Sequence, residues 1–169
     1  MRMKHSIFNS VFFTFFALMG LFSVAHAQDS TKNSEPSKAS IIEKQIENKD
    51  FVFVANMVSP AGDMTRNLTD YYSVNIKNDS LKVDLPYFGH ADYVPINTTN
   101  TSLTFTSTNF VYTVVKKKKG KWDIFIKLKD NDETRSISIT AYENGTAYAS
   151  VTTVNRSPIS YDGYLEEKK

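Results

Sequence analysis

The stretch Leu81-Lys82-Val83-Asp84-Leu85-Pro86-Tyr87-Phe88-Gly89 contains both the pattern and the interruption that decide the fold. Apolar residues alternate with charged ones over residues 81–85, which predicts a β-strand with one buried and one solvated face. Pro86 has no backbone N–H to donate, so strand pairing should stop there or continue only at a sheet edge. Gly89 permits the positive φ that a tight turn often needs. Residues 81–89 therefore predict a strand followed by a turn.

Tyr87 and Phe88 lie between these two interruptions. Two large rings in a turn are costly to leave in water, so we expect them to pack against other residues. The simpler interpretation is a plug that closes one end of the core. The alternative is the aromatic lip of a binding site.

Seven further stretches carry a strand pattern, and short turns separate most of them. Asn144-Gly145 is the strongest hairpin signal in the chain. Because short turns force antiparallel neighbours, we expect an all-β domain, with one short N-terminal helix, as an eight-strand antiparallel meander. It has to close as a barrel or a sandwich, since a flat sheet would leave its apolar face wet. The expected strands are residues 51–57, 72–77, 80–85, 103–105, 110–116, 122–129, 135–142 and 146–154.

The inward rows of these strands combine large and small side chains. Trp122 and Ile124 belong to a bulky row, whereas Ala147 and Ala149 line the last strand. Alanine at these positions either makes room for a bulky neighbour, such as Trp122 or Phe88, or leaves a cavity.

One helix is expected before the first strand. Ser37 or Ser40 can cap it, and the helical pattern runs to Asn48. A single short amphipathic helix is not stable alone, so it must pack on the sheet. The polar residues 28–40 predict a flexible linker. Four side chains fall at helical spacing on one face: Ile41, Ile42, Gln45 and Ile46.

The first 27 residues have the organisation of a secretory signal. Arg2 and Lys4 precede an apolar run, and Ala25-His26-Ala27 supplies the small residues that signal peptidase requires. We expect cleavage after Ala27; the alternative is an uncleaved membrane anchor. The chain has no cysteine and therefore no lipobox. The expected mature protein is periplasmic or secreted, with no stable membrane span.

Removal of residues 1–27 leaves a neutral chain. The full sequence has 20 basic and 18 acidic residues, and the signal contains two of the basic residues and none of the acidic ones. A neutral domain is not expected to bind nucleic acid. Without a disulfide, residues 41–169 must be stabilised by a single hydrophobic core, which is sufficient at this length.

A second interrupted stretch follows the last expected strand, with the sequence Asn155-Arg156-Ser157-Pro158-Ile159-Ser160-Tyr161-Asp162-Gly163-Tyr164. Pro158 blocks continuous strand pairing before Ile159. The stretch shares its make-up of proline, rings and glycine with residues 85–89. We therefore expect the two stretches to meet at one end of the sheet.

Over about residues 51–163 the chain resembles a family defined as a domain of unknown function, number 4251. The resemblance implies a β-rich protein exported to a Gram-negative envelope, and it implies no activity. Relatives in that family are often lipoproteins, from which this chain departs because it has no cysteine. The resemblance is carried by Leu85-Pro86-Tyr87-Phe88-Gly89, Phe105, Trp122, Asn144-Gly145 with Ala147, and Asn155-Arg156 with Ile159, Tyr161 and Gly163.

The residue types limit catalytic chemistry. His90 is the only histidine after residue 27 and cysteine is absent, so a single chain cannot supply a nitrogen and sulfur zinc site or a cysteine nucleophile. A Ser-His-Asp triad would need His90. We expect no enzymatic activity, no metal and no cofactor. A carboxylate pair for glycan or lipid hydrolysis could come only from positions that mostly look solvated: Asp84, Asp92, Asp123, Glu143 and Asp162.

Residues 116–119 and Lys121 form a basic hairpin tip. Its simplest explanation is a solvated turn that prevents edge-to-edge strand pairing. The alternative is electrostatic contact with anionic lipid headgroups or glycans.

Three functions fit these observations. The first is a non-catalytic binding domain for a small ligand with apolar and acidic parts, in which rings supply apolar contact and Arg156 holds the acidic group. The second is a protein-interaction module that pairs through a sheet edge with another envelope protein. The third is the hydrolase. The candidate binding residues are Tyr87, Phe88, His90, Tyr93, Arg156 and Tyr161.

Overall fold

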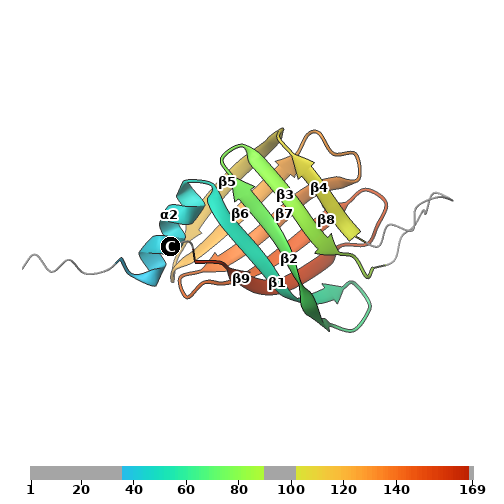
Figure 1. Cartoon of the computed structure of the whole chain (residues 1–169), viewed down its shortest axis with the longest axis horizontal. Coiled ribbons are helices and arrows are strands. Elements are labelled where there is room, and N and C mark those ends of the chain that lie inside the picture. Colours follow the sequence, from blue (N-terminus) through green and yellow to red (C-terminus); the bar gives the residue numbers. More distant parts are fainter. Residues whose placement is uncertain (1–35, 90–101, 168–169) are drawn as a thin grey trace, which may run out of the picture. The chain divides into compact units, whose positions relative to one another are not determined.

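The computed structural model describes residues 36–89 and 102–167, which all belong to one compact unit, Glu35–Lys169. These residues form one helix and nine strands (Figure 1). The elements are α2 (Lys38–Glu47), β1 (Asp50–Pro60), β2 (Arg66–Lys77), β3 (Ser80–Pro86), β4 (Ser102–Ser107), β5 (Phe110–Lys117), β6 (Lys121–Leu128), β7 (Thr134–Tyr142), β8 (Thr146–Thr153) and β9 (Ile159–Leu165).

The nine strands form one antiparallel sheet in the order β4-β3-β2-β1-β9-β8-β7-β6-β5. Strands that follow one another in the chain are paired, with the exception of β4 and β5, which are the two edge strands of the sheet. The first and last strands, β1 and β9, pair with each other. The sheet curls into a half-barrel, with β1–β4 in front of β5–β9 in Figure 1. The predicted all-β antiparallel meander is confirmed, and its first and last strands join the two halves.

The sequence predicts eight strands, and the additional one is β9. This strand pairs with β1 on one side and β8 on the other, so it is the seam between the two halves of the sheet. Asp162 and Gly163 interrupt its apolar alternation, which hid the strand pattern. A side chain at Gly163 is excluded because a Cβ there would lie 1.9 Å from the carbonyl oxygen of Val54.

The interior is filled by the inward rows that the sequence predicts. Trp122 is followed across the sheet by its register partners Ala141, Ala147 and Gly163. In the next row Tyr161 also pairs with an alanine. The small residues therefore lie beside the two bulky rings, and Trp122 and Tyr161 are almost completely buried.

α2 covers one end of the half-barrel, which we call the helix end. Of the two candidate caps the structure uses Ser37, whose hydroxyl accepts a hydrogen bond from the backbone N–H of Ser40 at 3.3 Å. The helix begins at Lys38, inside the stretch predicted as linker. Ile42 and Ile46 are completely buried, so the helix packs on the sheet as predicted.

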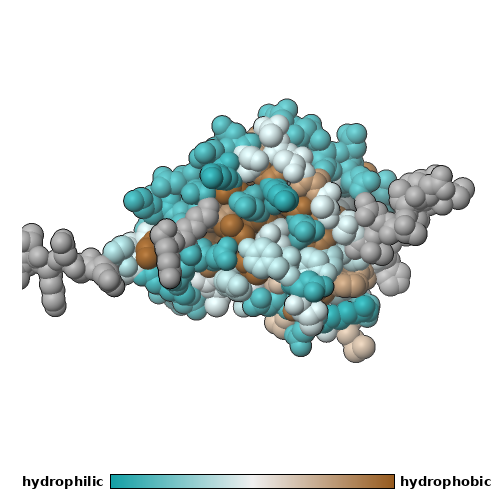
Figure 2. Space-filling view, viewed as in Figure 1, coloured by the Kyte–Doolittle hydropathy of each residue, from teal (hydrophilic) through white to brown (hydrophobic). Residues whose placement is uncertain are grey.

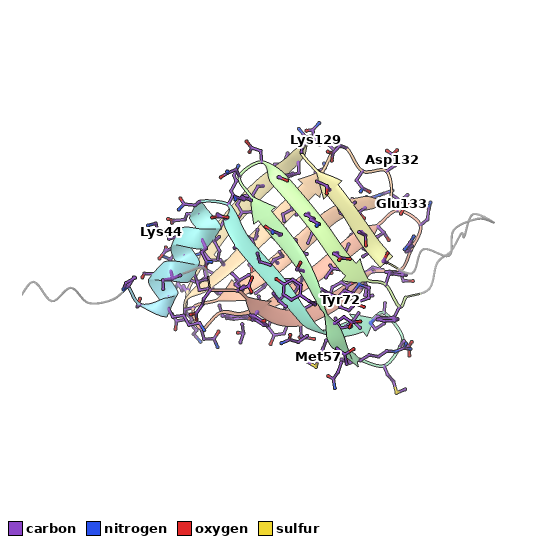
Figure 3. The ribbon with its side chains drawn as sticks, viewed as in Figure 1. Lys44, Met57, Tyr72, Lys129, Asp132 and Glu133 are labelled. Atoms are coloured by element: carbon purple, nitrogen blue, oxygen red, sulfur yellow. The ribbon has the colours of Figure 1, made fainter. Side chains whose placement is uncertain are left out.

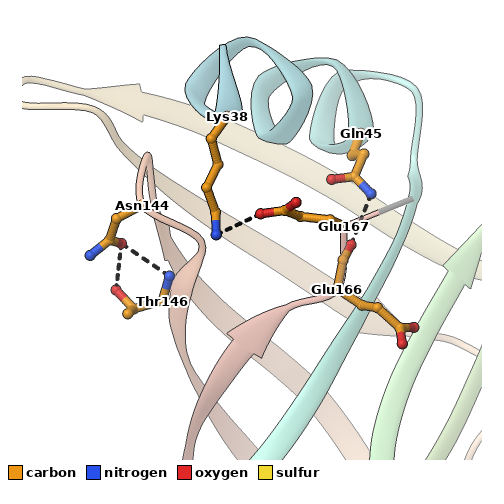
Figure 4. A network of polar contacts seen from close by, with 6 residues as sticks. All are labelled: Lys38, Gln45, Asn144, Thr146, Glu166 and Glu167. Carbon is orange, nitrogen blue, oxygen red and sulfur yellow. Dashed lines mark hydrogen bonds and ion pairs between the residues drawn. The ribbon is translucent and has the colours of Figure 1, made fainter. Parts of the chain in front are cut away.

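Polar contacts hold α2 to both sides of the half-barrel opening. On β5 the hydroxyl of Tyr112 donates to the backbone oxygen of Ile46 at 2.9 Å. Beyond β9 the backbone oxygen of Glu166 accepts from Nε2 of Gln45 at 3.0 Å (Figure 4). The helix thus bridges strands from the far end of the sheet to its seam.

The basic tip between β5 and β6 is partly neutralised. Lys116 forms an ion pair with Glu43 of α2, and Lys121 lies 3.3 Å from a carboxylate oxygen of Asp123. The ammonium of Lys116 also lies 5.9 Å from the ring centroid of Trp122.

The face of the front strands is mainly hydrophilic, with smaller hydrophobic areas between the hydrophilic ones (Figure 2).

Candidate functional site

The two interrupted stretches meet at the end of the half-barrel opposite α2, which we call the loop end. The hydroxyl of Tyr87, just after β3, donates to the backbone oxygen of Ser157 at 2.9 Å. The hydroxyl of Tyr161 on β9 donates to the backbone oxygen of Pro86 at 2.7 Å. The predicted adjacency of the two stretches is therefore confirmed, and each of the two bonds joins one stretch to the other.

Tyr87 and Tyr161 close this end of the core. Their exposed fractions are 5% and 0%. Burial, and to a smaller extent the neighbouring Tyr87, raises the pKa of Tyr161 above its ordinary value, so the hydroxyl stays neutral and remains a donor. We call Tyr87 and Tyr161 the plug. Of the two rings for which a plug or a binding lip was predicted, Tyr87 is buried and Phe88 is 39% exposed.

Arg156 lies beside this plug, close to the surface. Its guanidinium carbon is 5.2 Å from the ring centroid of Tyr87, and one guanidinium nitrogen is 3.6 Å from a carboxylate oxygen of Glu133. The backbone oxygen of Arg156 accepts from the hydroxyl of Thr153 at 2.8 Å, which fixes the turn before β9. The positive charge is thus held in place by a ring and an exposed carboxylate.

Phe88 is the exposed ring of the loop end, with 39% of its surface accessible. The guanidinium carbon of Arg66 lies 5.3 Å from its ring centroid. Arg66 also donates to the carboxylate of Asp63 at 2.8 Å. Each of the two rings at residues 87–88 therefore has an arginine guanidinium within cation–π distance.

Arg66 is a residue that the sequence interpretation missed. The second strand was expected to begin at residue 72, whereas β2 begins at Arg66. Antiparallel pairing brings the start of β2 to the end where β3 finishes, next to Phe88. The turn signal Pro60-Ala61-Gly62-Asp63 could have placed Arg66 at the start of that strand.

A family model described as "Domain of unknown function (DUF4251)" matches residues 33–165. The chain belongs to this family. The match includes the helix as well as both interrupted stretches of this DUF4251 domain, and it is wider than the sequence resemblance.

A solved structure is similar to the DUF4251 domain: the crystal structure of a DUF4251 family protein from Bacteroides eggerthii DSM 20697. The TM-score is 0.58 at 14% identity, covering 77% of this chain and 87% of the other. At this identity the likeness shows the fold alone. No curated protein matches the chain.

The remaining candidates of the DUF4251 domain include residues on the strands and residues that the structure does not describe. His90, Tyr93 and Asp92 lie outside the described residues. Asp84 on β3 accepts from the hydroxyl of Thr104, and Asp123 on β6 accepts from that of Thr140, each at 3.1 Å. These two carboxylates thus belong to opposite halves of the sheet.

Residues 36–89 and 102–167 contain no group of three or more His, Cys, Asp or Glu side chains that could hold a metal ion. Among the same residues, no helix is both long and apolar enough to cross a membrane.

Proposed function

We propose that this DUF4251 domain is a non-catalytic binding domain that takes a small ligand with an apolar body and an acidic group at the loop end. The observation that carries this function is the pair of arginine–ring contacts at residues 87–88. They place the guanidinium of Arg66 beside the exposed ring of Phe88, and that of Arg156 beside the buried ring of the preceding residue, Tyr87. A carboxylate is the natural partner of guanidinium, and a ring offers apolar contact to the body of the ligand.

Of the two arginines, Arg156 has the longer contact with a neighbouring carboxylate. The Arg156–Glu133 separation of 3.6 Å is longer than a hydrogen bond, and 73% of the Glu133 side chain is exposed. The Arg156 side chain is only 16% exposed, so the open side of this pair is the Glu133 side. A ligand carboxylate that approaches from the Glu133 side can take the place of this long contact, whereas Arg66 is bonded to Asp63 at 2.8 Å.

The tyrosines support binding rather than chemistry. Both hydroxyls donate to backbone carbonyls and hold the loop end in one arrangement. A rigid wall reduces the entropy that is lost when a ligand binds.

The proposal that the domain is exported depends on residues 1–27. Their basic start, apolar run and Ala25-His26-Ala27 predict a secretory signal and a periplasmic or secreted domain.

Thermal unfolding with 4-phenylbutyrate, which has a ring and a carboxylate, tests this function. At about 100 times the dissociation constant we expect the melting temperature to rise by about 5 °C. The neutral analogue 4-phenylbutyramide should give little increase. Arg156→Gln and Phe88→Ala should each remove most of the increase, whereas Lys82→Gln, at an exposed position of β3, should leave it unchanged. If Arg156→Gln only lowers the melting temperature and no acidic probe raises that of the wild type, the loop end is structural.

A protein-interaction function is a second candidate, favoured by the two ends of the sheet. β5 is hydrogen-bonded to β6 on one side only. Val111 and Val115 on β5 are 43% and 38% exposed, and Phe125 on β6 is 50% exposed. An edge with apolar side chains can add a strand from a partner. A photo-crosslinker at position 111 should trap one specific envelope protein if this function holds, and diffuse or absent crosslinks would reject it.

A further inference from the structure

A cleft of about 550 Å³ lies beside α2, away from the loop end. Ligand sites commonly occupy roughly 300–1,000 Å³, so the size suits a small molecule. Residues 40–41, 44–45 and 48 recur at helical spacing, so one face of α2 forms a wall of the cleft. The lining residues are Pro36, Ser40, Ile41, Lys44, Gln45, Asn48 and Asp50.

Gln45 gives this cleft an unmet polar requirement. Its exposed fraction is only 7%, and its Oε1 has no hydrogen-bond partner among the described residues. Its Nε2 donates to the backbone oxygen of Glu166, which fixes the orientation of the amide (Figure 4). The backbone oxygen of Glu166 can only accept a hydrogen bond, so the NH2 group of the Gln45 amide must face it. The amide therefore cannot be reversed, and Oε1 still needs a donor.

Lys44 gives the same cleft a positive charge. It extends from α2 away from the sheet (Figure 3) and forms no ion pair among residues 36–89 and 102–167. Other lysines at the helix end do form pairs, including Lys38 with Glu167 at 2.6 Å. The hydroxyl of Ser40 is already committed to the backbone oxygen of Ser37 at 2.8 Å.

We propose that the cleft binds an N-acylated amino acid. The carboxylate of such a ligand pairs with Lys44, its amide N–H donates to Oε1 of Gln45, and its side chain contacts Ile41 and Pro36. This ligand differs from that of the loop end because it requires a hydrogen-bond donor as well as an acidic group.

Three matched probes separate the two requirements. N-acetyl-leucine carries the carboxylate and the N–H, N-acetyl-leucinamide lacks the carboxylate, and 4-methylpentanoate lacks the N–H. Each is titrated into the chain expressed from its full-length sequence and purified as the cell produces it, with backbone amide NMR signals as the readout. We expect N-acetyl-leucine to shift the signals of Ile41, Lys44, Gln45 and Asn48 with a roughly millimolar dissociation constant, and each partial probe to bind at least about fivefold more weakly.

Variants assign each contact. Lys44→Gln should weaken N-acetyl-leucine about fivefold but leave N-acetyl-leucinamide unchanged. Gln45→Met should weaken both acetylated probes and leave 4-methylpentanoate unchanged. Gln45→Met also removes the hydrogen bond to Glu166, in the segment after β9. Lys38→Met is the control, because it removes the ion pair to Glu167 in the same segment and should retain binding.

Equal binding of all three probes, full binding by both Lys44→Gln and Gln45→Met, or no shift in these helix signals would overturn the proposal. Loop-end signals report separately on the function proposed above, so failure at one site is distinguishable from failure at the other.

Discussion

The two ends of the half-barrel are closed by different means. At the helix end, a segment next to β1 in the sequence buries Ile42 and Ile46 in the core. At the loop end, the closing bonds join residues 70 and 75 positions apart, from tyrosine hydroxyls to backbone carbonyls. Both ends have hydrogen bonds from side chains to backbone carbonyls, but the helix end adds buried aliphatic side chains from a local segment, whereas the loop end is closed by tyrosines from distant segments.

This difference predicts different sensitivity to substitution. A buried isoleucine carries more free energy than a single hydroxyl, so truncations at the helix end should cost more stability. The loop end should be sensitive to removal of a few atoms, because a lost hydroxyl leaves a carbonyl without its donor. The tyrosine hydroxyls of the plug therefore give less stability than a buried isoleucine, but they hold the segments that carry Arg156 and Phe88.

The largest effect should come from the seam, which both ends share. Gly163→Ala places a Cβ 1.9 Å from the Val54 carbonyl oxygen, so β1 and β9 must separate. We expect a loss of about 3 kcal/mol or more in unfolding free energy, measured by urea denaturation with Trp122 fluorescence. Gly62→Ala is the matched control: its φ is +80° but no atom lies near, so we expect a cost of about 1 kcal/mol. Equal costs for the two variants would show that the seam is adaptable.

The next largest effect should be at the helix end. Ile46→Ala empties a completely buried site, and we expect it to cost about 2–4 kcal/mol in the same denaturation experiment. Ile41→Ala, on a partly exposed position of the same helix, should cost less than about 1 kcal/mol. A similar cost for both variants would contradict the assignment of Ile46 to the core.

A smaller effect is expected at the loop end. Tyr161→Phe keeps the ring but removes the donor to the Pro86 carbonyl, and we expect a cost of about 1–2 kcal/mol. Tyr148→Phe, at a residue that is 50% exposed, should cost almost nothing. Amide hydrogen exchange of Tyr161→Phe can show whether the loss of stability is local. Amides near residues 85–89 should exchange faster than in the wild type, and those of α2 should not. Uniform acceleration would mean that the two ends are not independent.

The smallest effect should be at the corner between β4 and β5, which belongs to neither end. The hydroxyl of Ser107 and the backbone N–H groups of Thr108 and Asn109 donate to Asp130 and lower its pKa below the ordinary value of 3.8. A lowered folded-state pKa gives stability that is present above pH 3.8 and lost as the pH falls through the folded value. Asp130→Asn should therefore be less stable than wild type at pH 7, with the difference shrinking below pH 3.8. A pH-independent difference would reject the ionised cap.

Much of the fold could be predicted from alternation and turns. The inward rows around Trp122, the helix ahead of β1 and the antiparallel meander follow from local spacing, which the chain displays directly. β9 could not be predicted in this way, because Asp162 and Gly163 interrupt its apolar alternation. Gly163 is needed there because β1 lies too close to leave room for a side chain.

The candidate site was predictable only in part. The shared make-up of the two stretches indicated that they meet, but not that the tyrosine hydroxyls are bonded to backbone carbonyls and buried. Arg66 was missed because polar residues at the start of β2 obscured where that strand begins. Such contacts depend on how the sheet curls, which no local pattern specifies.

Amide NMR titration of 4-phenylbutyrate into wild type and Arg156→Gln tests the binding function of the loop end most directly. We predict saturable shifts of the Phe88 and Arg156 signals in the wild type, weakened about tenfold or more by Arg156→Gln. No shift at the loop end at millimolar ligand, or the same shifts in Arg156→Gln, would contradict it.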